Sequence, residues 1–339
     1  MTHAKLGVTA AADYILRCRR ALILCHTNPD GDTLGSAQAL RRLITLTGGF
    51  ADVAVPSNVP ERLDFLADGV ISSPDADLYS EIIAVDVASV GQLGRFSDLA
   101  PRVGFMIDHH RSGEAFADSI IMPDASAAGG IIFEIYSELK ERGAVTPDAD
   151  VARYLFAAIS SDTGSFKFRN TTPYTFMAAA VLSSEIAKAD DGGPDTADIS
   201  RLLHDTVTEK ELRISVDVSK KITLYEDGAL AVCRITADDI RRLGADDSDF
   251  GGAIDVVRSL RGVIVAVTLR QKKDGSDVWK VSARSTADVD VAKVLSAFGG
   301  GGHLRAAGAT LNCPGDEAYE KVVSAFRRAV AKYKGRHGE

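Results

Sequence analysis

Apolar runs alternate with amphipathic stretches along the first half of the chain. Four short apolar runs have the length of buried strands, and they cover residues 21–25, 51–55, 81–87 and 103–107. Stretches with the apolar spacing of helices lie between or after them, over residues 34–46, 130–142 and 149–160. This alternation predicts an α/β domain with a largely parallel sheet flanked by helices.

The pattern changes at a polar stretch of small residues, "AKADDGGPDTAD", over residues 187–198. Its glycines, proline and aspartates are typical of an interdomain linker, and residues 199–222 after it have helical spacing. Predicted strands at 229–235, 263–270 and 278–284, with a closing helix at 316–334, then indicate a smaller α+β domain. We therefore expect one domain at 1–186, a linker and connecting helix at 187–222, and a second domain at 223–339.

Composition and charge narrow the class of protein. The chain has 339 residues, of which 45% are hydrophobic and 25% charged, as in an ordinary globular protein of about two domains. The formal net charge of -8 argues against a protein that coats nucleic acid, which would be basic. The four cysteines, Cys18, Cys25, Cys233 and Cys313, show no CxxC spacing and are expected to be reduced thiols, with Cys25 in the core.

The sequence shows no signal-peptide pattern and no apolar run near the ~20 residues of a transmembrane helix. We therefore expect a cytoplasmic protein that does not contact a membrane.

Acidic residues and histidines gather after the predicted strands. His26, Asp30 and Asp32 lie in "CHTNPDGDTLGSA", Asp86 follows "EIIAV", and Asp108-His109-His110 follow "VGFMI". Asp162 lies in "ISSDTGSF", after a predicted helix. Because ligands bind beyond the carboxyl ends of parallel strands, we expect these groups to face one crevice.

Each of these residues also has a simpler interpretation when it is taken alone. Asp86 could cap a helix, Asp162 could form a turn, and His109 and His110 could be ordinary surface residues. Together, so many charges in one crevice would be costly unless cations neutralised them. Mixed carboxylate and imidazole ligands suit Mn²⁺, with Mg²⁺, Co²⁺ or Zn²⁺ as substitutes.

Five motifs in combination resemble those of the DHH phosphoesterase superfamily. They are "HTNPDGD", "VDVAS", "DHH", "SDTG" and "FGGGGHLRAAG", and the last resembles the signature of the DHHA1 domain. With "FKFRNTTP" at 166–173, the chain is most similar to the bifunctional oligoribonuclease and phosphoadenosine phosphate phosphatase (nanoRNase) type. The resemblance covers nearly the whole chain, and it implies an N-terminal DHH catalytic domain and a C-terminal DHHA1 substrate-binding domain.

The resemblance also implies a role for each motif residue. Two manganese ions are implied, the first bound by His26 and Asp30, the second by Asp32, His109 and Asp162, with Asp86 bridging both. Asp108 would hold a histidine by its second ring nitrogen, and His110 would reach the phosphate or assist the leaving oxygen. The implied substrate-binding residues are Arg284, Gly300, Gly301, Gly302, His303, Arg305 and Asn170.

The implied function is hydrolysis of short oligoribonucleotides, or of linear dinucleotides such as pApA, to nucleoside 5′-monophosphates. Removal of the 3′-phosphate from 3′-phosphoadenosine 5′-phosphate would accompany it. Two divalent ions about 3.5–4 Å apart can activate a shared water for such reactions. A second domain that closes over the substrate would favour short chains over long ones.

Several alternatives stay open. Within the superfamily they are a cyclic dinucleotide phosphodiesterase, a RecJ-like exonuclease and a pyrophosphatase-like enzyme. A nucleotide-binding regulatory protein on the same scaffold is the alternative outside catalysis. Loss of a metal ligand would mark such a protein, but all six implied ligands are present. The sequence does not decide the cleavage polarity, and a homodimer also stays open.

Overall fold

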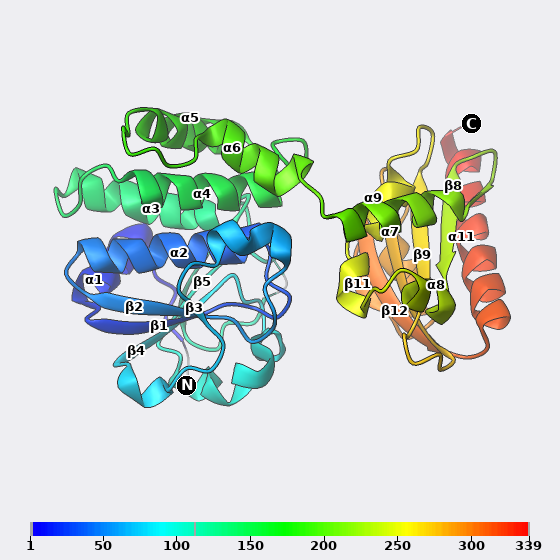
Figure 1. The fold of residues 1–339 in the computed structure, drawn as a ribbon, viewed down its shortest axis with the longest axis horizontal. Coiled ribbons are helices and arrows are strands. Elements are labelled where there is room, and N and C mark those ends of the chain that lie inside the picture. Colours follow the sequence, from blue (N-terminus) through cyan, green and yellow to red (C-terminus); the bar gives the residue numbers. More distant parts are fainter. Residues whose placement is uncertain (1–2, 112, 338–339) are drawn as a thin grey trace. The chain divides into compact units, whose positions relative to one another are not determined.

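The computed structural model describes residues 3–111 and 113–337 of the chain. These form two compact units, Met1–Thr206 and Val207–Glu339 (Figure 1). The predicted α/β class with a smaller second α+β domain is confirmed.

The first unit is built on a parallel sheet of six strands in the order β3-β2-β1-β4-β5-β6. The strands are β1 (Arg20–Leu24), β2 (Phe50–Ala54), β3 (Val70–Ile71), β4 (Glu81–Val85), β5 (Phe105–Asp108) and β6 (Asp118–Ile121). The chain moves outward from β1 to β3, then returns to add β4, β5 and β6 on the other side of β1. Such a reversal of strand order opens a crevice at the carboxyl ends of β1 and β4, where ligands bind in open sheets.

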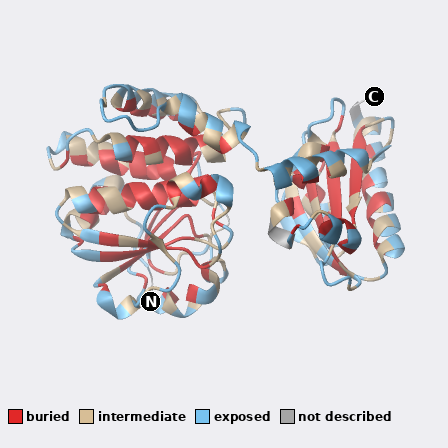
Figure 2. Ribbon diagram, in the orientation of Figure 1, coloured by how far each residue is buried: buried red, intermediate tan, exposed pale blue. Residues whose placement is uncertain are grey.

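Helices cover one face of this sheet. They are α1 (Val8–Arg17), α2 (Gly31–Leu46), α3 (Ala128–Glu141) and α4 (Ala149–Asp162), with α5 (Pro173–Ala187) and α6 (Thr196–Ser200) farther out (Figure 1). Buried residues fill the strands and the inner helices, and exposed residues lie on the outer helices (Figure 2). The short helices η1 (Glu61–Leu66), η2 (Ala76–Leu78) and η3 (Val90–Arg102) complete the unit, and Leu93 and Phe96 of η3 cover the opposite face.

Helices α2 and α4 approach each other closely at two glycines. A Cβ atom on Gly31 would lie 2.7 Å from Ser161 Cβ, and one on Gly35 would lie 2.6 Å from the Tyr154 carbonyl oxygen. The missing side chains let the start of α2 lie against the end of α4. This contact brings Asp32 near Asp162, the last residue of α4.

The predicted linker is largely attached to the first unit. The buried Arg153 guanidinium forms an ion pair with Asp191 and donates a hydrogen bond to the Pro194 carbonyl. Ile199 and Leu203 are buried in the core of the same unit. The expected continuous helix over 199–222 is instead broken: a π-helix, η4 (Arg201–Asp205), follows α6, and α7 (Glu209–Lys220) begins after the boundary between the units.

The second unit contains a mixed sheet of six strands in the order β11-β12-β10-β9-β8-β7. Its strands are β7 (Ile222–Tyr225), β8 (Leu230–Ile235), β9 (Val265–Gln271), β10 (Val278–Ser285), β11 (Gly301–His303) and β12 (Ala306–Asn312). Among the described strands of this sheet, β8 and β9 pair in parallel, and the other neighbouring strands pair antiparallel.

Helices cover both faces of this second sheet. One face packs against α10 (Val291–Ser296) and α11 (Gly315–His337). The other packs against α7, α8 (Ala237–Arg242) and α9 (Ala253–Arg258), with η5 (Asp247–Phe250) beside them.

The cysteines form no disulfide, and Cys18, Cys25 and Cys233 are buried, as expected. Within the described ranges, none of the helices has the length and apolar character needed to cross a membrane.

Candidate metal centre

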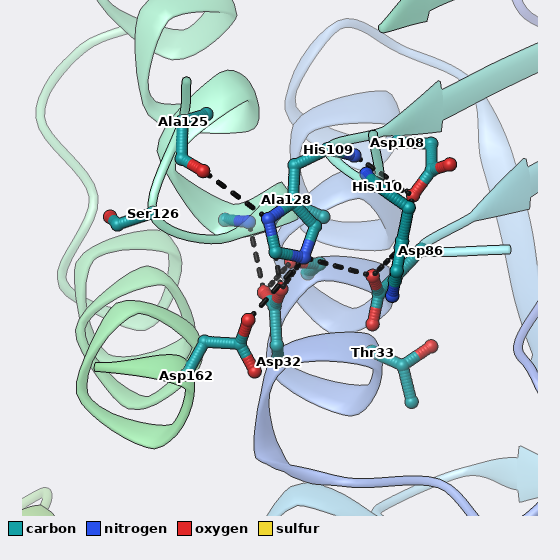
Figure 3. Close-up of polar contacts among 12 residues, drawn as sticks. Asp32, Thr33, Asp86, Asp108, His109, His110, Ala125, Ser126, Ala128 and Asp162 are labelled. Atoms are coloured by element: carbon teal, nitrogen blue, oxygen red, sulfur yellow. Dashed lines mark hydrogen bonds and ion pairs between the residues drawn. The ribbon is translucent and has the colours of Figure 1, made fainter. Parts of the chain in front are cut away.

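Four segments at the carboxyl edge of the first sheet bring the acidic and histidine residues together. Figure 3 shows Asp32, Asp86, His109 and Asp162 among them. The loop from β1 to α2 carries His26, Asp30 and Asp32, and Asp86 follows β4 directly. Asp108, His109 and His110 lie at the end of β5, and Asp162 ends α4. The side chains that the sequence predicts to share a crevice therefore do share one.

The first cluster consists of His26, Asp30 and Asp86. His26 Nε2 lies 3.4 Å from Asp86 Oδ2 and 3.9 Å from Asp30 Oδ1. The other ring nitrogen, Nδ1, lies 2.8 Å from the Thr27 carbonyl oxygen, to which it can only donate. With its proton on Nδ1, the ring offers the lone pair of Nε2 to a cation between these carboxylates.

The second cluster is formed around His109. Its Nε2 lies 3.3 Å from Asp162 Oδ2, 3.5 Å from Asp86 Oδ1 and 3.7 Å from Asp32 Oδ2. Its Nδ1 faces the Ala125 carbonyl oxygen at 3.3 Å, as Figure 3 shows. This arrangement repeats that of His26, because a backbone carbonyl again orients the ring toward a group of carboxylates.

Asp86 belongs to both clusters. Its two carboxylate oxygens point to different histidines, Oδ2 to His26 and Oδ1 to His109. The side chain is 3% exposed, and Oδ1 forms no hydrogen bond with the described residues. Its backbone has φ 58°, a left-handed conformation that costs a non-glycine residue about 1–3 kcal/mol. A buried oxygen without a hydrogen-bond donor, held by a strained backbone, fits a ligand position for a cation.

Asp108 orients His110 rather than joining either cluster. Its Oδ1 lies 2.7 Å from His110 Nδ1 and accepts hydrogen bonds from the backbone N–H groups of His109 and His110. The hydrogen bond to Asp108 is the main cause that raises the pKa of His110. His110 Nδ1 also lies 3.6 Å from Asp86 Oδ1. The His110 ring is therefore held at the edge of the site, with a third of its side chain exposed.

Asp32 is fixed by the first turn of α3. Its carboxylate accepts hydrogen bonds from the backbone N–H groups of Ala128 at 2.7 Å and Gly129 at 3.0 Å. Ser36 Oγ donates to the same carboxylate at 2.9 Å. These donors satisfy part of a fully buried charge, and they place Asp32 at the positive end of the α3 dipole.

The site without a cation binds extra protons. Burial raises the pKa of the Asp162 carboxyl to about 9, and the charges of Asp32 and Asp30 add to this effect. Burial disfavours the charged ring of His109, but its contact with Asp86 and the charges of the nearby carboxylates raise its pKa to about 10. Burial also disfavours the charged ring of His26, but its contact with Asp86 and the charge of Asp30 raise its pKa to about 9. Divalent cations would replace these protons as the neutralising charge.

Two family models match the chain. The DHH family, N-terminal domain, matches residues 20–159, and the DHHA1 domain matches residues 227–332. A protein of Thermus thermophilus, named a bifunctional oligoribonuclease and PAP phosphatase, is 30% identical over 322 residues that cover 91% of this chain and 90% of that protein. The chain belongs to the DHH family of phosphoesterases.

Two further similar proteins differ more from this chain, the first in its length and the second in its sequence. A cyclic-di-AMP phosphodiesterase of Geobacillus thermodenitrificans is 26% identical over 98% of this DHH chain, which spans only 50% of that protein. An exopolyphosphatase-related protein of Bacteroides fragilis superposes with a TM-score of 0.83 at 22% identity, over 98% of this chain and 97% of that one. The structural match supports the two-unit fold of the DHH protein.

Asn170 lies in the first unit, where its side-chain amide joins two backbone segments. Nδ2 donates to the carbonyl oxygens of Ser126 and Asp162, both at 3.0 Å. The group predicted to bind substrate therefore supports the segment that carries Asp162.

The predicted substrate residues of the second unit lie on or near a β-hairpin. Gly301, Gly302 and His303 form β11, which pairs with β12, and Gly300 directly precedes it. A Cβ on Gly300 would lie 2.4 Å from the Gly308 carbonyl oxygen, so only glycine fits this close backbone approach. His303 is exposed.

The two arginines of this region differ in their partners. Arg284 in β10 is half-buried, and its described hydrogen bond goes to the carbonyl of its own neighbour, Ala283. Burial lowers its pKa, and no carboxylate forms an ion pair with it within the described ranges. Arg305 forms an ion pair with Asp288. Arg284 is therefore the more available of the two for a phosphate.

The sequence does not reveal the side chains that form hydrogen bonds around the proposed ligands. Ser36 holds Asp32, and His204 Nε2 lies 2.9 Å from Ser160 Oγ, two residues before Asp162. His204 lies in the π-helix η4, a form often found at functional sites. A lone histidine after a polar stretch gives no signal of this contact in the sequence.

Proposed function

We propose that this chain hydrolyses phosphodiesters of short oligoribonucleotides and linear dinucleotides with the help of two divalent cations, preferably Mn²⁺. His26 and Asp30 would hold the first, and Asp32, His109 and Asp162 the second. The observation that carries the proposal is Asp86, whose two oxygens face the two histidine clusters. Cations in such a site lower the pKa of water and offset charge on the phosphoryl oxygens.

The remaining side chains have roles that follow from their contacts. Asp108 keeps the His110 ring in one orientation through Nδ1, and the raised pKa of His110 favours a protonated ring. A protonated imidazole at the edge of the site is suited to donate a hydrogen bond or a proton to the leaving oxygen. Asp108→Asn would weaken this orientation without removing a proposed metal ligand.

The choice of substrate rests on the relatives. The Thermus thermophilus protein, which matches along 90% of its length, is named for oligoribonuclease and PAP phosphatase activity. A Bacillus subtilis protein with the same name is 24% identical over 84% of this chain. We infer short RNA, linear dinucleotides such as pApA and 3′-phosphoadenosine 5′-phosphate as substrates. Arg284, His303 and the Gly300–Gly302 segment would bind a substrate phosphate in the second unit.

Chelation tests the role of metal. We expect dialysis against EDTA to abolish hydrolysis of pApA, and Mn²⁺ to restore it better than Mg²⁺ or Co²⁺. Metal analysis of the purified protein should give two ions for each chain. Full activity after chelation would contradict the proposal.

A substrate panel separates the candidates within the family. Initial rates with Mn²⁺ should be compared on a short oligoribonucleotide, pApA, 3′-phosphoadenosine 5′-phosphate and cyclic di-AMP. We expect the linear substrates to react faster. The alternative is a cyclic dinucleotide phosphodiesterase, which the Geobacillus relative favours, and faster turnover of cyclic di-AMP would establish it.

A further inference from the structure

A cavity of about 330 Å³ lies in the first unit, beside the segment that supports the candidate metal ligands. It is enclosed by the β6–α3 loop, the first turns of α3 and α5, and Ile159 of α4. Its volume is at the lower end of small-molecule sites, which span about 300–1,000 Å³. This volume is of the order needed for one small molecule rather than for an oligonucleotide.

One loop separates this cavity from the metal centre. Ala125 and Ser126 line the cavity. The Ala125 carbonyl faces His109 Nδ1 at 3.3 Å (Figure 3). The Ser126 carbonyl accepts a hydrogen bond from Asn170, which also donates to the Asp162 carbonyl. The loop that lines the cavity therefore also orients His109 and, through Asn170, contacts the segment that carries Asp162.

The walls of the cavity combine apolar side chains with a few polar groups. Met122, Ile159 and Ala178 supply apolar contacts. The Tyr174 hydroxyl donates a hydrogen bond to the Glu134 carboxylate, which has a second oxygen that can accept from a ligand. Tyr174 is 41% exposed, so its ring is accessible. An apolar pocket with a few polar groups is the usual design of a site for a small organic ligand.

The charges of the cavity disfavour a phosphate. None of the described residues that line it is basic, and Glu134 repels anions. Asp124, which also lines it, forms an ion pair with Arg111. A ligand with N–H donors and no negative charge fits these walls, whereas a phosphate fits the metal centre next to them.

We propose that this cavity is a subsite for a nucleobase of the substrate, with Glu134 accepting hydrogen bonds from its N–H groups. This proposal rests on the proposed function, because it assigns the base of a nucleotide whose phosphate reacts at the metal centre. A free nucleoside has the same chemistry, so adenosine serves as the probe.

Gly130 allows the cavity to be filled directly. It lies in α3 and lines the cavity, and a Cβ there would meet nothing within 4 Å. Gly335 in α11 is equally open and lies in the other unit, so Gly335→Leu is a matched control. Titration calorimetry on the full chain with Mn²⁺ should show at least tenfold weaker adenosine binding for Gly130→Leu and no change for Gly335→Leu.

The same titration with ribose 5-phosphate tests which part of the nucleotide is bound. Its affinity should not change in Gly130→Leu, because the cavity holds the base. Ala178→Val fills the cavity from α5 and replaces Gly130→Leu if that variant does not fold. Unchanged adenosine affinity in a folded cavity-filling variant, or an equal loss for ribose 5-phosphate, would overturn the proposal.

A kinetic arm distinguishes the substrate from a free nucleoside as the natural occupant. If the substrate base enters the cavity, Glu134→Gln should raise the KM for pApA severalfold in parallel with weaker adenosine binding. A changed adenosine affinity with an unchanged KM would overturn the assignment to the substrate. Failure of Mn²⁺-dependent hydrolysis in the unaltered protein would contradict the proposed function alone, since adenosine binding is measured without catalysis.

Discussion

Single residues determine the chemistry of the first unit, and Asp86 is the most constrained of them. Its buried carboxylate faces both histidine clusters, and its backbone adopts φ 58°. Asparagine tolerates this conformation and keeps the side-chain shape, so Asp86→Asn changes mainly the charge.

We expect Asp86→Asn to lower the rate of pApA hydrolysis about 10³-fold or more, because a ligand shared by both cations is lost. Metal analysis should show fewer than two bound ions. Asp98→Asn, an exposed aspartate of η3, is the control and should behave like the unaltered protein. Near-normal turnover of Asp86→Asn with both metals bound would show that the ligand assignment is wrong.

The protonation of the metal-free site predicts how metal binding depends on pH. The pKa values of His26 and Asp162 are raised to about 9, and that of His109 to about 10. Protonated rings and carboxyls do not bind cations, so metal binding must release protons. We expect Mn²⁺ affinity to rise with pH between about 7 and 10, with proton uptake by the buffer in calorimetry. Affinity independent of pH in this range would contradict the protonation states.

Much of the site is recognisable at the residue scale from the sequence, because the proposed ligands follow apolar strands or end a helix. The residues that hold these ligands in place cannot be recognised from the sequence. The contacts of Asp32 with Ala128 and of Asn170 with Ser126 join residues that are distant in sequence. Only the packing of α2 against α3, and of the loops that precede α3 and α5, brings them together.

Elements of secondary structure position the ligands through close helix contacts. Helix α2 carries Asp32 at its start and packs along α4, which ends at Asp162. The contact depends on Gly31 and Gly35, because the neighbouring helix α4 leaves no space for a side chain at these two positions.

We expect Gly35→Ala to lower the free energy of unfolding by about 1–3 kcal/mol, because its Cβ would lie 2.6 Å from the Tyr154 carbonyl oxygen. This cost outweighs the gain of about 1 kcal/mol from better helix propensity. Gly130→Ala, whose Cβ meets open space, is the control and should show that gain. Urea unfolding of the metal-free chain measures both, and equal stability of the two variants would contradict the packing argument.

Long apolar elements are predictable, and short ones are not. The strands predicted at 21–25 and 51–55 match β1 and β2 within one residue at each end. β3 has two residues and β11 begins with glycines, so neither has a strand pattern. Their formation depends on pairing with a neighbouring strand rather than on local preference.

At the scale of the whole molecule, the chemistry and the recognition of a second substrate phosphate are expected to belong to different units. The proposed metal ligands all lie before Thr206, and Arg284 and His303 lie after it. With a net charge of -8, the chain depends on cations and a few arginines to attract an anionic substrate.

We expect Arg284→Ala to raise the KM for pApA about ten- to a hundred-fold, since a charge-assisted bond to phosphate is worth about 1.5–3 kcal/mol. Hydrolysis of bis-(p-nitrophenyl) phosphate, which lacks a second phosphate, should be nearly unchanged. Lys280→Ala on the same strand is the control. Equal losses on both substrates would assign Arg284 to the chemistry instead.

The attachment of residues 187–206 to the first unit decides where the chain can be divided. A truncated protein that ends at Ala187 would uncover the apolar surface that Ile199 and Leu203 bury. It would also leave the buried Arg153 guanidinium without the Asp191 carboxylate. Such a fragment should aggregate, whereas one that ends at Thr206 keeps these contacts and should remain monodisperse in gel filtration. Any effort to study the two halves separately, or to join them with an artificial tether, should therefore cut after Thr206.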